Sequence, residues 1–93
     1  MPHPRKIILH CPHGYDPRID LLVEEFIRDG VVFVGVAGKD STKIEDTIDE
    51  IVLGDGTRNY ELLTSSHETV EDALDLAGSM SGDFSGDTHV LTI

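Results

Sequence analysis

Three side chains with metal-binding or nucleophilic chemistry stand close together near the start of the chain: His10, Cys11 and His13. A thiol at the end of a strand, just before a helix N-terminus, can have a lowered pKa and act as a nucleophile. We therefore expect Cys11 to be the nucleophile of any enzyme built on this chain, with His13 or His67 as its acid–base partner. The alternative is that Cys11 is a small buried side chain with no chemical role.

The same histidines, together with Cys11, could instead hold zinc or another transition metal. Adjacent strand residues point to opposite faces of a sheet, so His10 and Cys11 could share an ion only if the strand ended before them. The spacing of these residues also matches no standard zinc finger or zinc ribbon. Loop histidines commonly make local hydrogen bonds instead, and we expect no metal or other cofactor.

A second group of side chains could hold a small anionic ligand. These are basic or hydroxyl side chains at predicted strand ends or in first helical turns: Arg18, Lys39, Ser41, Lys43, Ser65 and Ser66. Helix N-termini would add backbone N–H donors and the positive ends of helix dipoles to the same region. The alternative is that these side chains are solvated and that aspartates such as Asp16 and Asp40 balance the positive charges among them.

The position of Cys11 can be compared with two families. Low-molecular-weight tyrosine phosphatases and the cysteine-phosphorylated sugar-transport subunits place a cysteine at this point in a similar order of elements. The phosphatase loop needs one residue fewer between its cysteine and its arginine than the six that separate Cys11 from Arg18. Pro12 also removes one of the amides that would cradle a phosphate. The likeness is therefore limited to the order of elements and does not extend to the motif.

Alternating strand and helix patterns would position these side chains. Apolar runs predict strands over residues 6–11, 31–37, 60–64 and 88–93, and helical spacing of apolar residues predicts three helices between them. The first helix is expected to begin with Asp16 as its N-cap and Pro17 at its first position, and to end at Gly30. The second helix is expected to begin at a capping box of Thr42 and Glu45 and to end at Gly54. The third is expected to begin at a capping box of Ser65 and Glu68 and to end at Gly78.

This βαβαβαβ order predicts a single three-layer α/β domain over residues 1–93. Its four-stranded, mostly parallel sheet would be Rossmann-like or flavodoxin-like, with residues 1–5 as an N-terminal tail and 79–87 as a flexible loop. Right-handed crossovers favour the strand orders 2-1-3-4 and 3-2-1-4, of which we prefer 2-1-3-4. The apolar second strand argues against an edge position for that strand unless a partner chain covers it. A ligand would bind beyond the carboxyl ends of the strands.

Charge and composition limit the classes of partner. The chain has 93 residues, with 7 basic and 18 acidic side chains and a net charge of −11. Phosphate backbones and anionic lipid repel such a chain, so we expect it to bind neither nucleic acid nor a membrane surface. The single cysteine is typical of a protein from the reducing cytoplasm, and no apolar run is long enough for a transmembrane helix.

These observations favour a non-catalytic binding or protein-interaction domain in the cytoplasm. We expect such a domain to self-associate or to bind a basic protein, since opposite charges steer association. Two alternatives stay open at this point. One is a Cys11-dependent enzyme or phosphoryl carrier with an anion site at the strand ends, and the other is a protein that binds a metal through histidine and cysteine.

Overall fold

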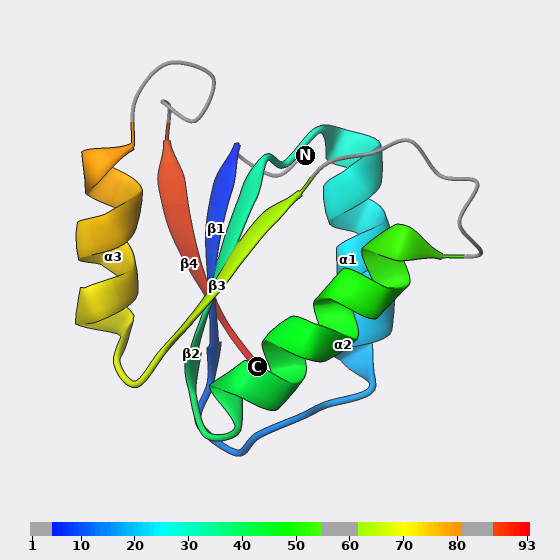
Figure 1. Cartoon of the computed structure of the whole chain (residues 1–93), viewed down its shortest axis with the longest axis horizontal. Helices are drawn as coiled ribbons and strands as arrows, with labels where there is room; N and C mark the ends of the chain where they lie inside the picture. Colours follow the sequence, from blue (N-terminus) through cyan, green and yellow to red (C-terminus); the bar gives the residue numbers. More distant parts are fainter. Residues whose placement is uncertain (1–4, 55–61, 81–86) are drawn as a thin grey trace.

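One parallel sheet lies between two layers of helices (Figure 1). The computed structural model describes residues 5–54, 62–80 and 87–93, and within these ranges there are four strands and three helices. The strands are β1 (Lys6–Cys11), β2 (Phe33–Gly38), β3 (Leu63–His67) and β4 (Thr88–Thr92). The helices are α1 (Arg18–Asp29), α2 (Ser41–Leu53) and α3 (Val70–Ser79). The predicted α/β class is therefore confirmed. Most of the predicted 79–87 loop lies outside the described residues.

The strand order is β3-β2-β1-β4, and every neighbouring pair is parallel. Our preference for 2-1-3-4 was wrong, and the order is the other of the two that we considered. The physical reason lies in β2, whose residues Phe33 to Ala37 are buried on both faces of the sheet. Such a strand is stable in the interior, with hydrogen-bonded neighbours on both sides, whereas the serine- and threonine-rich β3 tolerates the edge.

Alternate residues of the central strands supply two cores of different thickness. Ile7, Leu9 and Cys11 of β1 pack with α1 and α2 on one face. Ile8 and residues of β2 pack against α3 on the other face, where the buried side chains of α3 are Ala73 and Ala77. Small residues let α3 lie close to the sheet, so this second core is thin.

Lys6 is a buried basic residue at the amino end of the sheet, only 4% exposed. Its Nζ donates a hydrogen bond of 2.7 Å to the carbonyl oxygen of Ala77, in the last turn of α3. A helix C-terminus carries carbonyls without helical partners and the negative end of the dipole, so a buried ammonium is stabilised there. The sequence pattern did not reveal this contact, because Lys6 and Ala77 are far apart along the chain.

The predicted start and end of α1 are confirmed. Pro17 already has helical dihedral angles (φ −56°, ψ −22°), and the backbone N–H of Arg18 donates to Oδ1 of Asp16 at 2.8 Å. Asp16 therefore caps the helix, and Pro17 occupies its first position, one residue before Arg18, where the assigned helix begins. Gly30 ends the helix in the left-handed conformation with φ 80°.

Two predicted capping boxes were wrong. Thr42 lies inside the first turn of α2, after Asp40, which adopts a left-handed φ of 57° and makes no side-chain cap. The N-cap of α3 is Thr69 rather than Ser65, since Oγ1 of Thr69 accepts a hydrogen bond from the N–H of Asp72 at 3.2 Å. Gly78, expected to end this helix, lies within it.

The third strand also begins later than predicted. We expected residues 60–64, but β3 spans Leu63–His67 and pairs with β2 so that Ala37 lies beside His67. Residues 60 and 61 lie outside the described residues. Pairing with β2 places the three polar residues that we expected in a loop, Ser65, Ser66 and His67, within the ladder.

The cap of α3 gives a stability prediction. We expect Thr69→Ala to lower the free energy of unfolding by about 1 kcal/mol, because the N–H of Asp72 loses its acceptor at the helix start. Urea denaturation followed by circular dichroism measures this change. Thr47→Ala is the matched control: Oγ1 of Thr47 donates to the carbonyl of Lys43 within α2 and caps no N–H, so its effect should stay within about 0.5 kcal/mol. Equal losses in the two variants would contradict the role of Thr69.

Candidate functional site

Cys11 is the last residue of β1, and its side chain is fully buried in the core beneath α1 and α2. Its Sγ lies 3.9 Å from the carbonyl oxygen of Leu9. Burial, together with the negative charge of Asp16, raises the pKa of the thiol from an ordinary value of 9.0 to about 11. This direction is opposite to the lowered pKa that a nucleophilic thiol at a strand end can have, and it agrees with our alternative interpretation of a buried side chain. A nucleophilic role for Cys11 stays a prediction, with the thiol in its unreactive form at neutral pH.

Of the three residues predicted to be catalytic, Cys11 and His67 lie on opposite faces of the sheet. Cys11 packs into the core on the α1 and α2 face, whereas His67 lies in β3 beside Ala37, a residue of the core beneath α3. Laterally paired residues of a sheet point to the same face, so His67 lies on the face opposite Cys11. His13 is exposed in the loop after β1. The sheet thus separates the thiol of Cys11 from the imidazole of His67.

His10 and Cys11 are both within β1, so their side chains point to opposite faces and cannot bind one ion. On the α3 face, Nδ1 of His10 lies 3.4 Å from Oγ1 of Thr92 in the neighbouring strand. Within residues 5–54, 62–80 and 87–93, no three histidine, cysteine or acidic side chains are grouped closely enough to hold a metal ion. Two of the described histidines have a side-chain partner nearby: His10 lies against Thr92, and His67 lies against Ser65.

Ser65 and His67 form a hydrogen-bonded pair on β3. Oγ of Ser65 lies 2.7 Å from Nε2 of His67, and both side chains are half-buried. Serine and histidine at this distance are the first two members of a hydrolytic triad. Among the described residues, however, no carboxylate hydrogen bonds to the other nitrogen of His67. The pair therefore lacks the orienting group of a catalytic triad.

The residues predicted to hold an anion do not converge. Arg18 forms a two-pronged ion pair with Asp16, with Nε 3.0 Å from Oδ1 and Nη2 3.1 Å from Oδ2. This pairing lowers the pKa of Asp16 and raises that of Arg18. The charge of Arg18 is thus already balanced, as our alternative interpretation required. Ser66 approaches Thr42 of α2 at 3.4 Å, on the face opposite Ser65.

The remaining members of that group follow β2. The N–H of Lys39 donates to the carbonyl of Cys11 at 3.1 Å, and the N–H of Gly14 donates to the same oxygen at 3.2 Å. The loops after β1 and β2 are therefore joined at one carbonyl group. Ser41 is half-buried and Lys43 exposed at the start of α2. The expected strand-end loops after β1 and β2 are therefore adjacent, and the anion site stays a prediction.

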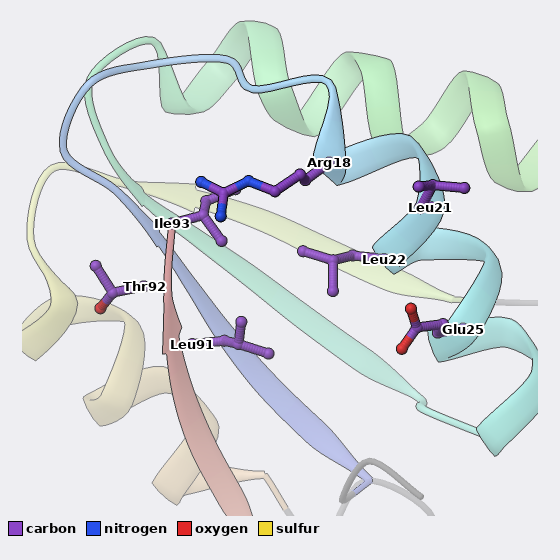
Figure 2. Close-up of a pocket in the computed structure, with 7 residues that line it drawn as sticks. All are labelled: Arg18, Leu21, Leu22, Glu25, Leu91, Thr92 and Ile93. Carbon is purple, nitrogen blue, oxygen red and sulfur yellow. The ribbon is translucent and has the colours of Figure 1, made fainter.

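A hollow of about 330 Å³ lies instead between α1 and β4 (Figure 2). Its lining comes from the two elements alone: Arg18, Leu21, Leu22 and Glu25 of α1, then Leu91, Thr92 and Ile93 of β4 and its end. The chain runs from β1 through β2 to β3 on one side of the sheet and then crosses to β4 on the other. The topological switch point therefore lies between β1 and β4, and the hollow lies beside it, over the α1 face of β4. Ligands of open parallel sheets commonly bind near this point, beyond the carboxyl ends of the strands.

Apolar side chains form the inside of the hollow, and charged side chains lie at its margin. Figure 2 shows Leu22 and Leu91 facing each other across the space, while Arg18 extends toward Ile93. Leu21 is 70% exposed beside them. Our sequence analysis missed this site; the signal that could have indicated it is Leu21, which falls outside the apolar stripe of the predicted first helix. A large apolar side chain away from the buried stripe of a helix commonly marks a contact surface when it adjoins other apolar groups.

Comparisons with known proteins add no functional information. No protein-family model, curated protein or solved structure matches this chain. None of the helices in the described part of the chain has the length and apolar composition needed to span a bilayer. The fold and the hollow between α1 and β4 therefore carry the functional argument.

Proposed function

We propose that this chain is a non-catalytic protein-interaction domain that receives apolar side chains of its partner in the hollow between α1 and β4. The observation that carries the proposal is the hollow itself, beside the switch point of the sheet, with Leu22, Leu91 and Ile93 along it. Its volume of about 330 Å³ falls within the range of natural binding pockets. Burying an aliphatic side chain there would contribute roughly 1.5–3 kcal/mol to binding.

The chemistry of the described residues supports binding over catalysis. A nucleophile needs a low pKa and a base within reach, whereas Cys11 has a raised pKa and lies across the sheet from His67. A phosphoryl carrier would also need free positive charge near the thiol. Asp16 neutralises Arg18, which leaves Lys39, whose N–H donates to the carbonyl of Cys11, as the basic residue beside β1. The Cys11-dependent enzyme and the metal-binding protein therefore have less support than an interaction domain.

Charge distribution indicates what kind of partner surface the hollow accepts. The outer positions of α2 and α3 carry acidic side chains: Asp46, Asp49, Glu50, Glu71, Asp72 and Asp75. The hollow has one basic and one acidic side chain, Arg18 and Glu25. A strongly basic partner would therefore be held on the outer faces of α2 and α3, while the hollow suits an apolar surface of low net charge.

The hollow can be tested with 1-hexanol as a stand-in for an aliphatic side chain of the partner. In methyl ¹H–¹³C spectra, we expect saturable shifts at Leu22, Leu91 and Ile93. Leu21→Asp should weaken this binding about tenfold, because it removes apolar contact area and brings in a charge. Leu53→Asp is the matched control, since Leu53 is 64% exposed on α2, away from the hollow. Equal effects of the two variants, or shifts spread evenly over all methyl groups, would contradict the proposal.

A further inference from the structure

Among the described residues, no strand pairs with the outer edge of β4, which leaves a row of backbone hydrogen-bonding groups there. The N–H of Lys6 donates to the carbonyl of Asp87 at 3.3 Å, and the N–H of Ile93 donates to the carbonyl of His10 at 3.0 Å. Backbone groups of alternate strand residues point the same way, so residues 87, 89, 91 and 93 hydrogen bond toward β1. The N–H and C=O groups of Thr88, Val90 and Thr92 therefore point away from β1.

Nothing in the sequence of β4 protects this edge. Natural edge strands carry lysines, prolines, bulges or inward charges that prevent pairing with another chain. β4 reads Thr-His-Val-Leu-Thr and has none of these. Val90 is 45% exposed on the α3 face, and on the α1 face Leu91 lines the hollow together with Leu22 and the exposed Leu21 of α1. Apolar surface thus lies on both faces of the open edge.

The other edge of the sheet differs in charge. Oγ1 of Thr64 in β3 donates to Oε2 of Glu45 at 3.1 Å and to Oδ1 of Asp49 at 2.7 Å, so carboxylates of α2 lie alongside β3. β4 carries no carboxylate. A second copy of this chain also has a net charge of −11 and is repelled from most of the first copy. Asp87 directly precedes β4 and Glu25 of α1 lies at the margin of the hollow, but no residue of β4 itself is acidic. Two copies can therefore approach at this edge without a carboxylate in the paired strands.

We propose that two copies of this chain associate through antiparallel pairing of their β4 strands, with Val90 opposite Val90 on the two-fold axis. The inference rests on the proposed function, because it names a second copy as the partner that covers this side of the molecule. The outward groups are self-complementary in this register. Val90 exchanges hydrogen bonds with Val90, and Thr88 of each copy exchanges them with Thr92 of the other.

This pairing also extends the floor of the hollow. The two-fold axis is perpendicular to the joined sheet, so α1 of both copies lies on the same face. His89 of one copy then lies opposite Leu91 of the other in a non-hydrogen-bonded pair, in which the two side chains are close together. Self-association was expected from the apolar second strand, but β2 is interior and paired on both sides. The surface responsible is the β4 edge instead.

Analytical ultracentrifugation of the full chain tests the dimer. We expect a reversible monomer–dimer equilibrium whose dissociation constant falls when NaCl is raised from about 50 mM to about 500 mM. At the higher concentration the Debye length is only roughly 4 Å, so salt screens the mutual repulsion of two acidic chains. Val90→Pro removes the central outward N–H, which makes no bond to β1, and should weaken association at least tenfold. Val90→Lys places two like charges at the axis and should have the same effect without a proline.

Ser66→Pro is the matched control, because the N–H of Leu63 donates to Val32 and the alternate residue Ser66 therefore points outward from β3. This variant should dimerise like the unmodified chain. A chain that stays monomeric at millimolar concentration and high salt, or a dimer insensitive to both Val90 variants, would overturn the proposal. A monomer that still binds 1-hexanol between α1 and β4 would leave the hollow as the site of a different protein partner. A chain that dimerises as expected but does not bind 1-hexanol would overturn the proposed function while supporting the β4 dimer.

Discussion

Gly38→Ala should lower the free energy of unfolding by at least about 3 kcal/mol. Gly38 has a φ of 111°, which side chains disfavour, and an added Cβ would lie 2.6 Å from the carbonyl oxygen of Cys11. That carbonyl also accepts the N–H groups of Gly14 and Lys39, so it cannot move without breaking the junction between the two loops. The loss is a large fraction of the stability of a small domain, and urea denaturation measures it.

Gly78→Ala is the control for this prediction. Gly78 lies inside α3, and an added Cβ would have nothing within 4 Å. Alanine is the better helix former, so this variant should be more stable by about 0.5–1 kcal/mol. The same substitution is thus expected to have opposite signs at the two glycines. A loss below about 1 kcal/mol for Gly38→Ala would show that the loops after β1 and β2 are not held as described.

The thiol of Cys11 should react with iodoacetamide at least about a hundredfold more slowly in the folded chain than in guanidinium chloride. A pKa raised from 9.0 to about 11 lowers the thiolate fraction by about that factor at neutral pH, and full burial adds to the protection. Mass spectrometry of the alkylated chain over time gives both rates. Equal rates in the folded and unfolded chain would revive the hypothesis of a reactive Cys11.

The same raised pKa predicts a dependence of stability on alkaline pH. The folded state favours the protonated thiol, so the contribution of Cys11 is fully present below pH 9 and is lost as the pH rises through about 11. The loss reaches at most roughly 2–3 kcal/mol. Cys11→Ala removes this titration, so the difference in unfolding free energy between the two chains should narrow above pH 9. A constant difference from pH 8 to pH 11 would contradict a buried, protonated thiol.

Local features of the chain were predictable from its sequence. Asp16, Pro17 and Gly30 indicated the first helix, because caps and left-handed glycines act over a few residues. The alternation of strands and helices likewise indicated a parallel α/β sheet, since parallel neighbours need crossover helices. The third strand begins later than we predicted, because its position depends on pairing with β2 and no local sequence pattern in Leu63–His67 indicates that pairing.

The chemistry of the candidate site depended on tertiary structure. The sequence by itself determined the fold class, the net charge of −11 and the polar inventory of the strand-end loops. Only the packed structure decided that Cys11 is buried beneath α1 and α2, that His67 lies on the other face, and that Asp16 neutralises Arg18. It also left a hollow between α1 and β4. These outcomes depend on strand order and on which face each side chain occupies, and both are set by contacts between residues far apart in the chain.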